Sequence, residues 1–268
     1  MALLTFKFGG TSMGDATIIK GVAQIILDAA EEGHPVLTVV SAMTGVTNTL
    51  LSAARAAAEG DPQAYIKATA DLRDRHHETG RALVANGEAQ EALLAEVHRL
   101  IDEFQALCQS IAVLGEVTPR GLDAVASIGE RLSARLLAAH LQQRGAAALP
   151  VDATNLIVTT DTFQNAVPLM DKTRARVQER LVPRLKAGVL PIVTGFIGAT
   201  EKGITTTLGR GGSDYSAAIL AACAEADELW IWTDVDGVMT TDPRLVPDAR
   251  VIPVLSYREV GELAFFGA

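Results

Sequence analysis

Apolar and polar positions alternate along the chain in blocks that predict strands and helices in turn. Residues 3–8 alternate apolar and polar side chains and predict a strand that ends at Gly9-Gly10. Asp15 precedes an apolar stripe over residues 16–31, as is typical of a helix N-cap. Residues 36–40, VLTVV, are typical of a short strand buried in a parallel sheet. This β-α-β order predicts a layered α/β fold with a right-handed crossover.

Downstream, the pattern changes to a long helical block and then returns to alternation. From residue 62 to 114 the apolar positions recur every three or four residues, which predicts a helical insertion packed on the sheet. The remaining predicted elements are a helix over 123–144, strands near 147–151 and 156–159, a helix over 171–187, a strand over 189–198, a helix over 213–224, a strand over 228–238 and a helix that begins near 256. Regular alternation of strands and helices favours an α/β sandwich.

Composition and charge narrow the class of protein. The 268 residues are 49% hydrophobic and 21% charged, an ordinary globular balance. A net charge of −9 argues against a nucleic-acid groove as the main surface. Cys108 and Cys223 each lie in an apolar helical pattern and are expected to be buried free thiols. The sequence has neither a signal-peptide pattern nor a membrane-spanning apolar run, so we expect a cytoplasmic protein without a membrane partner.

Four clusters of small and polar residues follow apolar strands. They are KFGGTS at 7–12, SAMTGVTN at 41–48, TGFIG with GRGGSD within 194–214, and TDVDGVMTTDPR at 233–244. In open α/β sheets, ligands bind outside the carboxyl ends of the strands. The four clusters therefore predict one ligand site at that edge.

The residue types in these clusters indicate an anionic ligand. Lys7 stands just before glycines that expose backbone N–H groups, a combination that suits phosphate. Arg210 can fork onto a carboxylate, while Asp214 can hold an ammonium, organise a lysine or cap a helix. The chain contains neither G-x-x-x-x-G-K-[ST] nor a G-x-G-x-x-G fingerprint after the first strand, which disfavours the P-loop and dinucleotide classes.

Other candidate residues have plainer interpretations. Glu130 next to Arg131 is typical of a solvated helix face. His76 and His77 are typical of a surface helix, because no second Cys or His cluster lies at metal-ligand spacing. The absence of G-x-S-x-G disfavours a hydrolase.

The motifs taken together resemble a known series. KFGGTS, VVSAMTGVTN, SIGERLSA, TGFIG, TLGRGGSDYSA and TDVDGVMTTDPR follow the order seen in the aspartate kinases of the amino acid kinase family, over residues 6–268. The resemblance implies a three-layer αβα sandwich with a mostly parallel central sheet of about eight strands. It also implies ATP- and Mg²⁺-dependent phosphorylation of the side-chain carboxylate of L-aspartate to 4-phospho-L-aspartate, at the start of the route to lysine, threonine and methionine.

The resemblance further implies roles for individual residues. Lys7 and Asp214 would be catalytic, with Lys7 neutralising charge on the transferring phosphoryl group. The substrate-binding residues would be Ser41, Thr47, Glu130, Phe196, Arg210, Ser213 and Asp214, with Glu130 at the α-ammonium and Arg210 at a carboxylate. The nucleotide-binding residues would be Lys7, Gly9, Gly10, Thr11, Thr233, Asp234, Met239 and Arg244. Met239 stands where some relatives carry an aromatic residue, so the contact with the base stays open; no residue is assigned as a metal ligand.

The sequence and the resemblance also predict the domain organisation of the chain and leave alternative functions open. Residues 1–268 are expected to form one catalytic domain that ends inside a helical pattern, where the family continues into a lysine-containing segment and regulatory ACT domains. The resemblance implies a homodimer. Two other functions stay open: an amino acid kinase acting on glutamate, acetylglutamate or carbamate, and a non-catalytic amino acid sensor.

Overall fold

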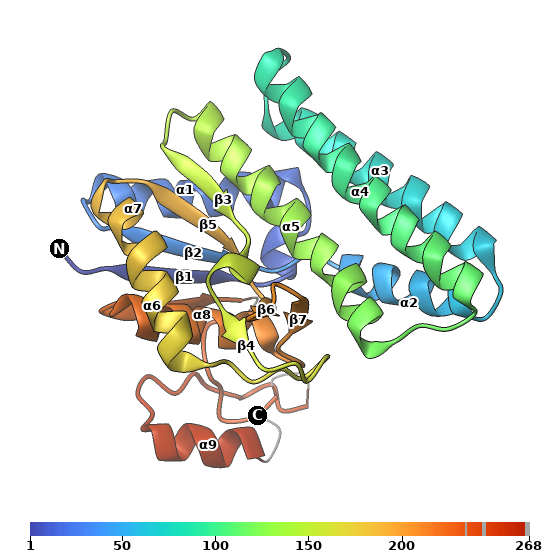
Figure 1. Ribbon diagram of the computed structural model, residues 1–268. Coiled ribbons are helices and arrows are strands. Elements are labelled where there is room, and N and C mark those ends of the chain that lie inside the picture. The colour runs from blue at the N-terminus through green and yellow to red at the C-terminus, as the bar shows by residue number, and fades with distance from the viewer. Residues whose placement is uncertain (234, 243–244, 266–268) are drawn as a thin grey trace. The chain divides into compact units, whose positions relative to one another are not determined.

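The larger part of the chain is built around a parallel β-sheet. The computed structural model describes residues 1–233, 235–242 and 245–265 and divides into two compact units, Met1–Trp232 and Thr233–Ala268. In the first unit, five parallel strands stand in the order β3-β5-β2-β1-β8 (Figure 1). Their bounds are β1 Leu4–Phe8, β2 Val36–Val40, β3 Ala148–Val151, β5 Leu190–Thr194 and β8 Glu228–Trp232.

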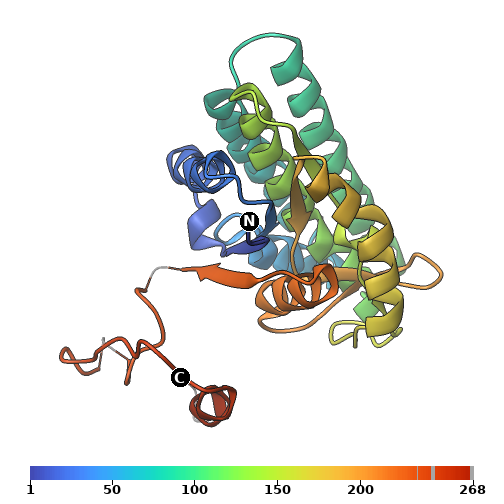
Figure 2. The same ribbon diagram turned by 90° about the vertical axis from the view of Figure 1, so that its left-hand side faces the viewer.

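Helices cover both faces of this sheet and give three layers. Val36 and Val40 of β2 belong to one buried cluster, and Leu37 and Val39 belong to the other, as the two-residue period of a strand requires. The first cluster includes residues of α1 (Ala16–Glu31) and α5 (Pro119–Gln143). The second includes residues of α6 (Met170–Arg180), α7 (Val182–Lys186) and α8 (Gly212–Ala224). Figure 2 shows the sheet nearly edge-on between these layers.

A smaller sheet continues from the central one. It contains β4 (Val158–Thr159), β6 (Ile197–Thr200) and β7 (Thr205–Thr207), with β6 antiparallel to β7. The single strand predicted over 189–198 is wrong, because the chain bends at Phe196, whose φ is 66°, and passes from the central sheet to the smaller one. The α/β sandwich itself is confirmed, but the expected central sheet of about eight strands is wrong. Among the described residues the central sheet has five strands, and three further strands form the smaller sheet.

The predicted helical insertion is confirmed. It consists of α3 (Pro62–Leu83) and α4 (Glu88–Leu114), which lie side by side next to α2 (Val46–Ala58) and α5 (Figure 1). His76, which we predicted to lie on a surface helix, is fully buried in α3, and its Nδ1 hydrogen-bonds the carbonyl oxygen of Leu72 at 2.7 Å. The surface interpretation of His76 is therefore wrong.

Several boundaries differ from the prediction for local reasons. Helix α5 begins at Pro119, since the side chain of Thr118 caps it by accepting from the backbone N–H of Gly121. The helix predicted over 171–187 divides into α6 and α7, since Pro183 has no N–H to continue the ladder. Cys108 and Cys223 are buried and free, as predicted.

The second unit is smaller. Among its described residues, Met239 and Val251 form an antiparallel bridge, and α9 spans Tyr257–Phe265. The strand predicted over 228–238 ends at Trp232, where the first unit ends. Within the described residues, no helix has the length and apolar character needed to cross a bilayer.

Candidate active site

The carboxyl ends of β1 and β2 and the loop before α8 open into a cavity of about 500 Å³. Nine of the residues named from the sequence line it: Lys7, Gly10, Ser41, Thr47, Glu130, Phe196, Arg210, Ser213 and Asp214. They come from segments as far apart as residues 7 and 214. Three of the four polar clusters therefore meet where the parallel-strand argument expects a ligand.

One side of the cavity is built for an anion. The Nζ of Lys7 lies 2.7 Å from a carboxylate oxygen of Asp214 and only 10% of the lysine side chain is exposed. Gly211 to Ser213, at the start of α8, line the same side. First-turn N–H groups and the positive end of this helix favour negative charge there. The sequence left three roles open for Asp214: holding an ammonium, organising a lysine or capping a helix. The ion pair with Lys7 agrees with the second of these roles.

The opposite side holds a buried carboxyl group. Glu130 is 3% exposed on α5, and its Oε1 accepts from the backbone N–H of Ala42 at 3.3 Å. This approach depends on Gly129, because a Cβ there would come within 2.8 Å of the Cβ of Ala42. Its Oε2 is buried and finds no hydrogen-bond partner among the described residues. The solvated-face interpretation of Glu130 is wrong.

Burial controls the protonation of Glu130. Removal from water raises the pKa of this carboxyl to about 8, against the hydrogen bonds from backbone groups, which lower it. A carboxyl group in this position gains most from a cationic ligand group, which would pair with the free Oε2 and favour the charged form.

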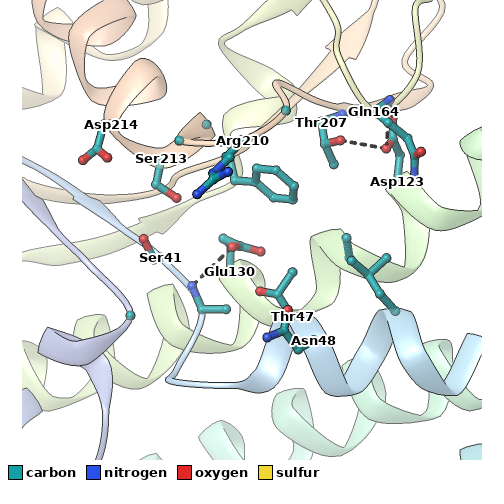
Figure 3. A pocket seen from close by; sticks show the side chains of 18 of the residues that line it. Ser41, Thr47, Asn48, Asp123, Glu130, Gln164, Thr207, Arg210, Ser213 and Asp214 are labelled. Atoms are coloured by element: carbon teal, nitrogen blue, oxygen red, sulfur yellow. Dashed lines mark hydrogen bonds between the residues drawn. The ribbon is translucent and has the colours of Figure 1, made fainter. Parts of the chain in front are cut away.

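Arg210 and Ser213 stand across the cavity from Glu130 and Thr47, as Figure 3 shows. Arg210 is solvent-exposed in the loop between β7 and α8, so its guanidinium can meet an incoming ligand. The cavity thus pairs a buried acid on one side with an arginine on the other. Such an arrangement fits a ligand that carries both an ammonium and a carboxylate.

The structure adds cavity residues that the sequence reasoning missed. They include Thr44, Asn48, Asp123, Gln164 and Thr207. Asp123 is 1% exposed, and burial raises the pKa of its carboxyl against three hydrogen bonds that favour the charged form. A signal existed, since Asp123 precedes Glu130 by seven residues, which places both on one face of α5.

The remaining sequence candidates lie elsewhere. Gly9 and Thr11 flank Gly10 but are not among the described residues that line the cavity. Thr233 and Met239 belong to the second unit. Asp234 and Arg244 lie outside the described residues.

The layered sheet, with polar turns meeting at the carboxyl ends of its strands, defines an α/β protein with a site for a small anionic ligand. The model of the amino acid kinase family matches residues 4–268 of the chain. The chain therefore belongs to the amino acid kinase family.

Within this family the chain is similar to aspartokinases. It is 35% identical over 266 residues to the lysine-sensitive aspartokinase 3 of Escherichia coli, covering 99% of this chain and 56% of that protein. It is 35% identical over 263 residues to a bifunctional aspartokinase/homoserine dehydrogenase of Arabidopsis thaliana, covering 98% of this chain and 28% of that protein. The expected resemblance is confirmed.

The fold agrees with that of a solved relative. E. coli aspartokinase III in complex with aspartate and ADP (R-state) superposes with a TM-score of 0.90 at 35% identity, over 99% of this chain and 57% of that one. The chain thus spans between 28% and 57% of the length of these matched proteins.

Proposed function

We propose that this chain is the catalytic domain of an aspartate kinase, which transfers the γ-phosphoryl group of ATP to the side-chain carboxylate of L-aspartate. The observation that carries the proposal is the pairing of Glu130, with its unpartnered buried Oε2, and Arg210 in one cavity with Lys7. Relatives over nearly the whole chain are named aspartokinases, and one solved relative holds aspartate and ADP.

The cavity supplies one partner for the ammonium and one for a carboxylate of the amino acid. Glu130 would accept from the α-ammonium, and Arg210 would fork onto a carboxylate. Ser41 and Thr47, which line the same space, would donate hydroxyl hydrogen bonds. Phe196 and Ser213 would close the pocket beside α8.

Phosphoryl transfer then requires positioning and charge neutralisation rather than a base. The substrate carboxylate is already ionised at neutral pH, so its oxygen attacks the γ-phosphorus directly while the bond to the ADP oxygen breaks. Lys7 would neutralise the charge on the transferring group, and Asp214 would hold the lysine in place. Gly10 and the first turn of α8 would offer backbone N–H groups to the phosphates.

The proposed reaction also requires a nucleotide and a metal ion. We propose ATP as the phosphoryl donor, with Mg²⁺ carried mainly by its phosphates and by water, as this cation prefers. The Asp214 carboxylate at the cavity is the type of group that adds one protein ligand to such an ion. Gly9, Thr11, Thr233, Asp234, Met239 and Arg244 stay proposed nucleotide residues.

The oligomeric state, the location and the partners are proposed from the sequence and its resemblance to aspartate kinases. We propose a cytoplasmic homodimer whose partners are small molecules, without nucleic acid or membrane. Light scattering of the purified chain tests the dimer.

A substrate panel tests the function. ADP release is measured with L-aspartate, L-glutamate, N-acetyl-L-glutamate, N-acetyl-L-aspartate and carbamate, using wild type and Glu130→Gln. We expect turnover with L-aspartate and none with N-acetyl-L-aspartate, because acetylation removes the cation that Glu130 would pair with. Turnover with acetylglutamate or carbamate, or nucleotide-independent binding of aspartate without any turnover, would contradict the proposal in favour of another kinase or a sensor.

A further inference from the structure

Asp123 ties together two segments that are distant in sequence. Its carboxylate accepts from the backbone N–H of Gln164 at 2.9 Å, from the backbone N–H of Thr207 at 3.0 Å and from the hydroxyl of Thr207 at 2.7 Å. Figure 3 shows this group at the end of the cavity away from Asp214. The protein's own donors occupy both oxygens, so Asp123 acts on the protein rather than on a ligand.

One of these donors belongs to a strained residue. Gln164 has φ of 67°, a left-handed conformation that is unfavourable for a residue with a Cβ. Such a conformation persists where the surroundings hold it. The hydrogen bond from its N–H to Asp123 is a contact that holds it.

The held turn lies directly against the residue before Arg210. Residues 162–165, closed by a hydrogen bond from Asn165 N to Thr162 O, form what we call the 162–165 turn. A Cβ on Gly209 would come within 2.8 Å of the Asn165 side-chain oxygen and 3.3 Å of the Gln164 carbonyl oxygen. Close packing of this kind transmits a shift of the turn to Gly209, and Arg210 follows in the chain.

The same carboxylate fixes the other side of the loop. Thr207 ends β7 two residues before Gly209, and its N–H and hydroxyl both bind Asp123. The backbone N–H of Ala166 in turn binds the Thr207 carbonyl oxygen at 2.9 Å. Asp123 therefore anchors the loop between β7 and α8, which carries Arg210, in two ways. It binds Thr207 at the start of the loop, and it holds the 162–165 turn that packs against Gly209.

We propose that Asp123 is a positioning residue for Arg210 and sets the KM for the amino acid substrate rather than the rate of phosphoryl transfer. This inference rests on the proposed function, because it gives Arg210 a substrate carboxylate to hold. Its position on α5, two helical turns before Glu130, makes one helix responsible for both ends of the substrate.

The test compares Asp123→Asn and Thr207→Val with a matched control, Thr206→Val. Thr206 is the neighbouring buried residue of β7, and its hydroxyl bonds that of Thr159 at 2.7 Å without contacting Asp123. Each variant loses a buried hydrogen bond, but only the first two disturb the Asp123 group. KM for aspartate, KM for ATP and kcat are measured by coupled ADP release, and each variant is repeated in an Arg210→Ala background.

We expect Asp123→Asn to raise the aspartate KM about tenfold and Thr207→Val to raise it somewhat less. In these variants Arg210 would be displaced but still present, so the loss of binding should be only partial. The KM for ATP and kcat should change by less than about twofold, and Thr206→Val should match wild type. In the Arg210→Ala background the effect of Asp123→Asn should shrink to less than about twofold, because the two residues act as one unit. Equal effects in both backgrounds, or an equal rise in Thr206→Val, would overturn the proposal.

A second measurement keeps this test separate from the proposed function. Amide hydrogen exchange over residues 160–168 and 207–211 should be faster in Asp123→Asn and Thr207→Val than in Thr206→Val, with no substrate present. Unchanged exchange would overturn the inference even if wild type phosphorylates aspartate. Faster exchange in these variants, with no turnover by wild type, would contradict the proposed function but would still support the anchoring by Asp123.

Discussion

The ammonium nitrogen of Lys7 lies 2.7 Å from a carboxylate oxygen of Asp214, joining the end of β1 to the first turn of α8. The lysine side chain is 10% exposed and the aspartate side chain 48%, so the pair faces the cavity from its wall. A lysine held in this way is already oriented when an anion arrives, and little reorganisation is required as charge develops.

Lys7→Ala should therefore reduce kcat by at least about a hundredfold, since the lost cation acts most strongly in the transition state. The matched control is Lys20→Ala, which removes an exposed lysine of α1. Steady-state kinetics measures the effect, and circular dichroism checks that the fold is intact. A folded Lys7→Ala enzyme with near-normal kcat would remove this lysine from the chemistry.

Arg210→Ala should affect binding of the amino acid. Loss of a charged hydrogen-bond pair of about 2 to 3 kcal/mol predicts an aspartate KM roughly a hundredfold higher, with little change in the KM for ATP. Arg55→Ala, an exposed arginine of α2, is the control. If the aspartate KM of Arg210→Ala equals that of the control, Arg210 does not hold the substrate.

Local patterns predicted the elements well where a local cause decides them. β2 spans Val36–Val40 as predicted, and Asp15 caps α1 by accepting from the N–H groups of Thr17 and Ile18. By contrast, the break at Phe196 lies in TGFIG, whose small residues do not specify that the chain leaves one sheet for another there. Only the packing of the whole molecule decides such a bend.

The candidate site shows the same difference between features that have a local cause and features that depend on tertiary packing. Glycine-rich turns after strands were sufficient to predict that Lys7, Ser41 and Arg210 share a cavity. The burial of Glu130 was not predictable from its neighbours, since it depends on the close approach of Gly129 to Ala42, which is 87 residues away. Asp123 was missed for a similar reason, as its donors come from two distant segments, a turn and the end of β7.

His76 should make the protein sensitive to acid. Burial lowers the pKa of His76 from 6.5 to about 4, so the unfolded chain binds a proton between these values that the folded protein does not. The free energy of unfolding should then fall as pH drops from 6.5 to 4, by on the order of 2 to 3 kcal/mol from this group.

Urea unfolding at pH 6.5 and pH 4.5 measures this slope in wild type, His76→Gln and His98→Gln. His98 is half-exposed and faces Asp102, so it serves as the control histidine. We expect the loss of stability in acid to be smaller in His76→Gln and unchanged in His98→Gln. Identical slopes in all three proteins would mean that His76 is not the group that titrates.

Glu130 should show a conflict between stability and function that depends on pH. Burial raises the pKa of its carboxyl to about 8, from an ordinary 4.5. The folded protein therefore keeps a proton that the unfolded chain releases, and the contribution of Glu130 to the free energy of unfolding should decrease as pH rises from 4.5 to 8. Glu130→Gln cannot titrate, so its stability advantage over wild type should grow across this window to on the order of a few kcal/mol.

Binding should respond in the opposite sense, because the α-ammonium of the substrate needs the ionised carboxylate. Wild-type affinity for aspartate should increase between pH 6.5 and 8, and binding near pH 7 should release a proton from Glu130, which calorimetry in buffers of different ionisation enthalpy detects. Glu130→Gln should bind aspartate weakly with no such increase, while Glu116→Gln, an exposed control, should behave like wild type. Denaturation at pH 5 and pH 8.5 supplies the stability half of the comparison. If wild type and Glu130→Gln gave parallel stability curves and released equal numbers of protons on binding, Glu130 would be neither the buried acid nor the ammonium partner.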